Sequence, residues 1–166
     1  MRVLCVVCVL ALIPAAARAT VIVPADLSEL TRDARAIAVG RVVAVDGRWT
    51  DDRKTIETIV TLDVDQYLKG SLGATVQFRV PGGDLGRYRN IVVGAPGFAV
   101  DQHVIVFLGA NGPMIPYIVG FNQGVYRVVR TADGSGWQVR GESPRLAPRP
   151  LADFEANVRA LAGAAK

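Results

Sequence analysis

Apolar and polar side chains alternate over much of the chain, which is the pattern of half-buried β-strands. The clearest example is TIETIVTLDVDQYLKG at 55–70, where one side of the predicted strand is mainly apolar and the other mainly polar. The segment HVIVFLG at 103–109 is apolar on both sides, so we expect it in the centre of a sheet. Strands are predicted at 36–50, 55–70, 75–80, 103–109 and 136–140, with two more inside 116–129 on either side of Asn122-Gln123-Gly124.

Two segments have helical periodicity instead. Residues 24–34 place Leu27 and Leu30 at helical spacing and predict a short helix. Residues 151–163 predict a longer amphipathic helix. Its apolar stripe is formed by Leu151, Phe154, Val158 and Leu161. Between the last strand and this helix, SPRLAPRP at 143–150 is a proline-rich connector with neither strand nor helix character.

This order of elements predicts an all-β domain with two flanking helices. Five or more strands between a helix at each end favour a small, strongly bent β-barrel of the OB-like type over residues 20–142. The C-terminal helix would then pack across the barrel. An immunoglobulin-like sandwich is the alternative, since it uses the same alternation.

The first nineteen residues have the pattern of a secretory signal peptide. Arg2 precedes an apolar run at 3–13, which is shorter than the roughly 20 residues that span a bilayer. Ala17 and Ala19 form the small-x-small cleavage signal. We therefore expect cleavage after Ala19, a secreted or periplasmic protein, and no membrane span in what remains.

Removing this segment changes the chemistry that the chain can carry. Both cysteines lie within it, so the mature chain would have no disulfide. The formal net charge is +4, and loss of Arg2 and Arg18 lowers it to +2, which is too mild to indicate a nucleic-acid partner. The aromatic residues are dispersed, and we expect most of them in the core.

The residue inventory does not indicate an enzyme. His103 is the only histidine, so a metal site with several histidines is excluded, and no Gly-x-Ser-x-Gly elbow is present. We expect no catalytic residue, no metal and no cofactor.

The segment VPGGDLGRYRNIVVGAPGF at 80–98 contains five glycines. Loops that bind phosphate lead from a strand into a helix, and no helical pattern follows here. We interpret the glycines as sites of positive φ at tight turns. Arg87, Tyr88 and Arg89 are a candidate binding rim, because arginine and tyrosine are favoured contact residues. The alternative is that two solvated arginines flank a packed Tyr88.

Several short motifs of the first half of the mature chain occur together. Val23-Pro24 precedes the helical stretch, ARAIAVGRVVAV follows at 34–45, and VTLDVDQYLKG at 60–70 ends in Lys-Gly. In this respect the chain resembles the netrin-like module of tissue inhibitors of metalloproteinases, which is an OB-type barrel. With cleavage after Ala19, Val23 and Pro24 become the fourth and fifth residues, as in those inhibitors.

The resemblance implies a role for the mature N-terminus. The amine and carbonyl of Thr20 would chelate the zinc of a secreted metalloprotease, and Val21 would enter its specificity pocket. The chain departs from the family because Thr20 and Ile22 stand where the inhibitors have cysteines. From the residues as a whole we expect a non-catalytic binding domain for an extracellular or periplasmic macromolecule, with a protein as its partner. The alternatives are a metalloprotease inhibitor and a structural envelope or adhesion module.

Overall fold

The computed structural model describes residues 25–142 and 147–164. The expectations for the signal segment with Ala17 and Ala19, and for Thr20, Val21, Val23 and Pro24, lie outside these residues. The elements are α1 (Leu27–Asp33), β1 (Ala36–Trp49), β2 (Ile56–Lys69), β3 (Thr75–Pro81), β4 (Gly83–Leu85), β5 (Tyr88–Asn90), β6 (His103–Gly109), β7 (Tyr117–Ile118), the 3-10 turn η2 (Phe121–Gly124), β8 (Val125–Arg130), β9 (Trp137–Gly141), β10 (Arg149–Pro150) and α2 (Leu151–Ala164).

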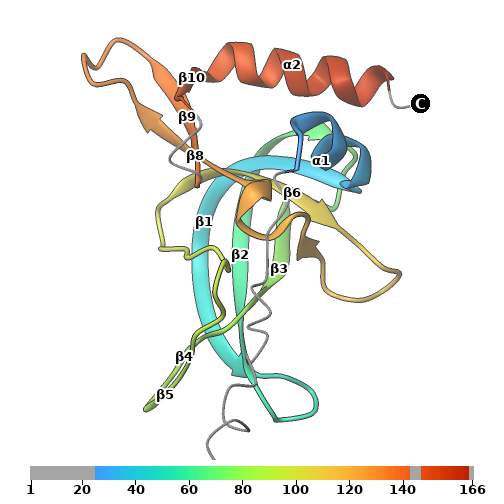
Figure 1. The fold of residues 1–166 in the computed structure, drawn as a ribbon, viewed down its shortest axis with the longest axis vertical. Coiled ribbons are helices and arrows are strands. Elements are labelled where there is room, and N and C mark those ends of the chain that lie inside the picture. Colours follow the sequence, from blue (N-terminus) through green and yellow to red (C-terminus); the bar gives the residue numbers. More distant parts are fainter. Residues whose placement is uncertain (1–24, 143–146, 165–166) are drawn as a thin grey trace, which may run out of the picture.

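The protein is mainly β-sheet with two helices, which confirms the predicted class (Figure 1). The main sheet has the order β1-β2-β3-β7-β6-β8-β9-β10, and β4 and β5 form a separate two-stranded sheet. β1 pairs antiparallel with β2 along one edge and with β6 along the other. β3 and β7 are parallel and meet at Arg79 and Tyr117.

Two apolar clusters lie on opposite faces of the strands. Along β6 the side chains alternate between them, since Val104 and Val106 belong to one cluster while Ile105 and Phe107 belong to the other. Residues 104–108 are all completely buried, as the apolar pattern of this segment predicts. The cluster with Ile105 and Phe107 is the one that both helices cover.

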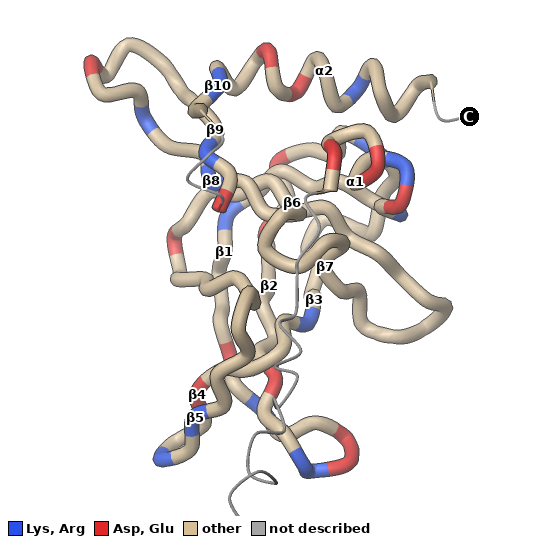
Figure 2. Tube along the Cα trace, in the orientation of Figure 1, with Lys and Arg blue, Asp and Glu red and all other residues tan. Residues whose placement is uncertain are grey.

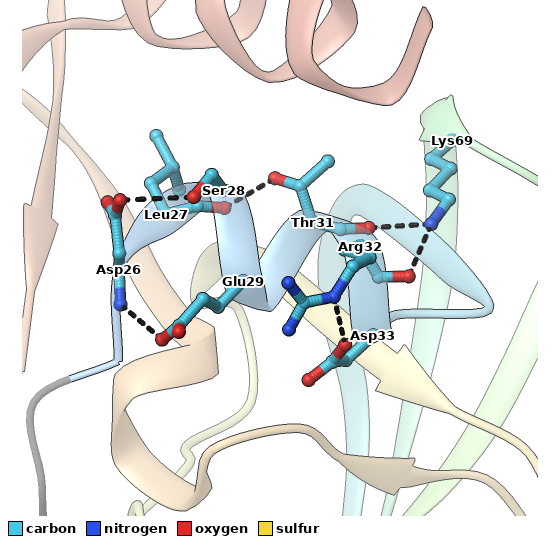
Figure 3. Close-up of polar contacts among 8 residues, drawn as sticks. All are labelled: Asp26, Leu27, Ser28, Glu29, Thr31, Arg32, Asp33 and Lys69. Atoms are coloured by element: carbon cyan, nitrogen blue, oxygen red, sulfur yellow. Dashed lines mark hydrogen bonds and ion pairs between the residues drawn. The ribbon is translucent and has the colours of Figure 1, made fainter. Parts of the chain in front are cut away.

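The short helix α1 is fixed at both ends by polar contacts (Figure 3). At its start, the Asp26 N–H donates to the Glu29 carboxylate at 3.3 Å, which is half of a capping box. At its end, the Lys69 ammonium on β2 donates to the carbonyl oxygens of Thr31 at 2.6 Å and Arg32 at 3.0 Å. A cation at this end satisfies carbonyls that have no partner within the helix.

The helix α2 lies across one end of the molecule, while the turn between β1 and β2 and the β4–β5 hairpin lie at the opposite end (Figure 1). Phe154 and Val158 are buried, and the Phe154 ring lies 4.6 Å from the ring of Tyr126 between centroids. This half of the predicted stripe therefore attaches α2 to the sheet. Leu151 and Leu161 are only partly buried.

Two expectations from the sequence differ from the structure. The segment 80–98 is not only a loop, because it contains the β4–β5 hairpin. The connector 143–150 does contain strand structure, because Arg149 and Pro150 pair with β9. Most aromatic residues do lie in or against the core, as expected, but Trp49, Tyr88, Phe121 and Trp137 have between 41 and 46% of their surface exposed.

Candidate functional site: a cleft beside two hairpins

The β4–β5 hairpin is held against the long β1–β2 pair by backbone contacts. The Gly82 N–H donates to the Ile56 carbonyl at 3.0 Å, and the Thr58 hydroxyl donates to the Gly82 carbonyl at 2.7 Å. At Gly47, strands β1 and β4 are so close that a Cβ atom would lie 1.9 Å from the Asp84 carbonyl oxygen. Only glycine allows this approach, so the sequence of β1 determines where the hairpin lies.

The predicted rim residues all lie on this hairpin and are exposed. The Tyr88 ring meets the ring of Trp49, with centroids 5.5 Å apart and planes at 61°. Arg87 donates to the Tyr88 hydroxyl at 2.8 Å, and its guanidinium carbon lies 5.0 Å from the centre of the ring. The structure therefore brings Arg87, Tyr88 and Arg89 together with an aromatic side chain from β1 that the sequence did not single out.

An ion pair closes the same hairpin. Arg89 binds both carboxylate oxygens of Asp84, at 2.5 and 3.0 Å. The hydrogen bonds from Arg89 lower the pKa of the Asp84 carboxyl, and Asp84 raises the pKa of Arg89. Residues of both signs are present at this hairpin tip and at the turn between β1 and β2 (Figure 2). The guanidinium of Arg89 is thus already occupied, which limits what it offers to a ligand.

The chain that follows the hairpin is fixed by Arg127 on β8. Its guanidinium donates to the Gly97 carbonyl at 2.7 Å, to the Gln102 amide oxygen at 2.5 Å and to the Glu142 carboxylate at 2.9 Å. Within this segment Ile91 is 77% exposed and Val93 is 89% exposed. The backbone is held, while apolar side chains face solvent.

A cleft lies between the turn that joins β1 to β2, the end of β3, the start of β7 and the chain around residues 90–96. We call it the Arg79 cleft. Its volume is about 410 Å³. It is lined by Thr50, Thr55, Ile56, Glu57, Arg79, Pro81, Gly82, Asn90, Val92, Pro96, Tyr117, Ile118 and Phe121. A volume of this size and a mostly apolar wall with a few polar groups are typical of ligand sites.

The β3–β7 pairing places two residues of this cleft next to each other. Arg79 and Tyr117 are direct partners across the parallel pair, and the Arg79 N–H donates to the Pro116 carbonyl at 2.8 Å. The Tyr117 ring lies over Gly109, where a Cβ atom would be 2.5 Å from the ring. The missing side chain at Gly109 therefore leaves the space in which Tyr117 lies.

The two charged residues of the cleft differ in their partners. The Glu57 carboxylate accepts two hydrogen bonds from Arg48, at 2.9 and 2.7 Å. Within residues 25–142 and 147–164, the Arg79 guanidinium forms neither a hydrogen bond nor an ion pair. Because Arg48 neutralises Glu57, the cleft presents one positive charge in largely apolar surroundings.

Phe121 closes the cleft in an unusual backbone conformation. Its φ is +57° and that of the preceding Gly120 is +68°. A bulky residue is rarely found in this region, because the left-handed conformation costs roughly 1–2 kcal/mol. Phe121 is 44% exposed, so burial of its ring compensates for this cost only in part.

A second depression, the Arg89 groove, lies on the other side of the chain at 81–98. Its volume is about 560 Å³, and Asp84, Arg89, Ile91 and Phe98 are among its lining residues. Phe98 packs against Phe78 with centroids 5.4 Å apart. The hairpin and the chain that follows it thus border both depressions.

The other residues that the sequence suggested as candidates lie away from the cleft or outside the residues that the structure describes. His103 at the start of β6 has its Nε2 atom 2.9 Å from an Asp65 carboxylate oxygen, without the alignment of a hydrogen bond. In the described part of the chain, no three His, Cys, Asp or Glu residues are grouped so that they could hold a metal. Thr20 and Val21 precede the described residues.

No protein-family model matches this chain, and comparisons with curated proteins and with solved structures give no significant match. Of the helices that the structure describes, none has the length and apolarity needed to cross a membrane.

Sequence reasoning missed four residues of the site: Trp49, Arg79, Tyr117 and Phe121. Trp49 ends an apolar strand next to a turn, which is a position where an aromatic ring can remain exposed. In TVQFRV at 75–80 the apolar and polar residues alternate, and Arg79 is at one of the polar positions. The pattern therefore gave it no special role. The unusual φ of Phe121 has no signal in the sequence apart from the glycine before it.

Proposed function

We propose that this chain is an exported, non-catalytic domain that binds an extracellular or periplasmic protein through the Arg79 cleft and its rim. The observation that carries the proposal is the cleft itself, an apolar depression beside half-exposed aromatic rings on a fixed backbone. Trp49, Tyr88 and Phe121 provide these rings. Partly exposed aromatic residues and arginines are the side chains that contribute most to protein interfaces.

The strand order supports an OB-like barrel as the framework of this site. The pairings run from β1 through β2, β3, β7 and β6 and then return to β1. We propose that these five strands form the closed barrel that the sequence pattern predicts. In OB-folds the face of strands 2 and 3 and the adjacent loops bind ligands. The Arg79 cleft includes residues of both β2 and β3, which agrees with that arrangement.

The rigid attachment of the rim favours binding over a purely structural role. Gly82, Thr58 and Arg127 fix the chain around 82–97, so a ligand would meet a surface that is already ordered. Less conformational entropy is then lost on association. An apolar segment such as Ile91 to Val93 costs solubility when it is exposed, and a partner that covers it would remove this cost.

The test is affinity capture from the secreted and envelope fractions of the host, with residues 20–166 as bait. We expect a saturable protein partner, and at least tenfold weaker binding to the Trp49→Ala and Tyr88→Ala variants. Trp137→Ala is the matched control, because Trp137 is 44% exposed but lies on β9 away from the cleft. A structural envelope or adhesion module would show no saturable partner.

Inhibition of a secreted metalloprotease is the second candidate, and an OB-like barrel would be its framework. It requires Thr20 as the first residue, with its amine and carbonyl on the protease zinc and Val21 in the specificity pocket. Adding one residue before Thr20 should abolish inhibition and leave a partner of the Arg79 cleft unaffected. Mass spectrometry of the secreted protein would show whether cleavage follows Ala19.

A further inference from the structure

The Arg79 cleft has a chemical asymmetry that indicates what its occupant carries. Its walls include the apolar residues Ile56, Pro81 and Phe121, and Arg79 is the one cationic residue that lines it. Arg79 is only partly exposed, and no carboxylate of the described residues pairs with it. Guanidinium groups bind carboxylates through two parallel hydrogen bonds, and such a pair is stronger where water is partly excluded.

Glu57, the acidic residue of the cleft, does not pair with Arg79. Glu57 lines the same cleft, but its carboxylate is bound by Arg48, with a closest distance of 2.7 Å. The Glu57 side chain is 12% exposed, so it is both neutralised and largely covered. A cationic ligand would meet the positive charge of Arg79, whereas an anionic ligand would be attracted by it.

The size of the cleft restricts the ligand further. At about 410 Å³, it is at the lower end of ligand-binding cavities, which range from about 300 to 1,000 Å³. A volume of this size accommodates one or two residues of a ligand. A C-terminal residue joins an apolar side chain and a carboxylate at a single Cα atom, so the two groups can contact the walls and Arg79 together.

We infer that the Arg79 cleft binds the C-terminus of a partner protein, with an apolar last side chain against Phe121 and the terminal carboxylate on Arg79. Tyr117, the partner of Arg79 across the β3–β7 pair, also lines the cleft, with its ring over Gly109 on β6. This inference rests on the proposed function, since it specifies what the partner presents to the same cleft.

The experiment is an NMR titration of the isotope-labelled protein with three peptides. The first is acetyl-Ala-Ala-Val-Leu with a free carboxylate, and the second is the same peptide as its C-terminal amide. The third is acetyl-Ala-Glu-Val-Leu amide, which places the carboxylate on a side chain. We expect the free acid to bind at least tenfold more tightly than either amide, with shifts at the Arg79 side-chain N–H.

The variants locate the effect. Arg79→Met should reduce the affinity for the acid to that for the amide, and Phe121→Gly should weaken both peptides. Arg140→Met is the control, because Arg140 is an exposed arginine on β9 whose loss changes the net charge equally. Equal affinity of the native protein for the acid and the amide would overturn the inference, and so would tighter binding of the glutamate peptide. The native protein alone decides this if the methionine variant does not fold.

Failure of the inference differs from failure of the proposed function. A captured partner that requires Trp49 but binds equally well to the Arg79→Met variant would contradict the C-terminal contact and leave the binding function intact. Absence of a saturable partner would contradict the binding function, whatever the peptides show.

Discussion

The Trp49 ring at the end of β1 packs edge to face on the Tyr88 ring of β5, with 5.5 Å between the centroids. This contact joins two hairpins that are far apart in sequence, and it forms the rim of the proposed site. Because an aromatic pair of this geometry is worth about 0.5–1.5 kcal/mol, we expect a coupling free energy of that size in a double-mutant cycle of Trp49→Ala and Tyr88→Ala.

The measurement is the free energy of unfolding of the native protein, the two single variants and the double variant. The same cycle with Trp137→Ala in place of Trp49→Ala should show no coupling, since Trp137 lies over Arg130 and not near Tyr88. Strict additivity of Trp49→Ala and Tyr88→Ala would mean that the ring contact does not link the hairpins.

Most of the framework could be predicted from the sequence because its strands are amphipathic or wholly apolar. The alternation in 55–70 predicted β2, and the doubly apolar segment 103–109 predicted a central strand. The β4–β5 hairpin could not be predicted in this way. Its strands have three residues each, and its position depends on contacts with Gly47 and Thr58, which lie more than 20 residues away.

The site was predicted only in part, for a related reason. Arg87, Tyr88 and Arg89 were recognised by residue type, and the structure does place them on an exposed rim. The Arg79 cleft forms where β3 meets β7, which pair at a single position. A single pairing produces no periodic pattern in the sequence. The cleft is created by tertiary packing and therefore could not be predicted.

Gly47→Ala is expected to displace the β4–β5 hairpin. The new methyl group would lie 1.9 Å from the Asp84 carbonyl oxygen, and this backbone atom can move only if the hairpin moves. We expect a loss of about 1–3 kcal/mol in the free energy of unfolding, as for other overpacked positions, and faster hydrogen exchange at 83–90. Gly97→Ala is the control, because no atom lies within 4 Å of a Cβ at that position. Unchanged exchange in Gly47→Ala would show that the hairpin does not depend on this contact.

Arg127→Met is expected to release the chain at 97–102. The substitution removes the hydrogen bonds to Gly97, Gln102 and Glu142 and leaves the Glu142 side chain, which is 26% exposed, without its cation. Hydrogen bonds to charged groups contribute about 1.5–3 kcal/mol, so we expect a loss of that order in the free energy of unfolding. Hydrogen exchange should rise at 97–102 and stay constant in β2. Arg140→Met should change the stability by less than about 0.5 kcal/mol, as exposed substitutions usually do.

The turn between β8 and β9 provides a test of the electrostatics. Hydrogen bonds from Thr131 and Ser135 lower the pKa of Asp133 from 3.8 to about 2. Because the folded pKa is below the unfolded value, the stabilising contribution is fully present above pH 3.8 and is lost as the pH falls through about 2. An NMR titration of the Asp133 carboxyl should therefore have its midpoint near 2. Ser135→Ala should raise this midpoint, and Ser71→Ala, at a distant turn, should not.

Phe121→Gly separates stability from binding. Glycine adopts the φ of +57° without strain, whereas phenylalanine pays roughly 1–2 kcal/mol for it. Two losses oppose this gain. Glycine has more conformational freedom in the unfolded chain, which costs about 0.4–1 kcal/mol of stability, and the variant loses the partly buried ring. We therefore expect the free energy of unfolding to change by no more than about 1 kcal/mol. Affinity for the free-acid peptide should nevertheless fall, because the ring forms a wall of the cleft. A large loss of stability would assign Phe121 to the framework of the fold. A stable variant that binds poorly would show that the strained backbone is retained to hold an aromatic ring at the ligand.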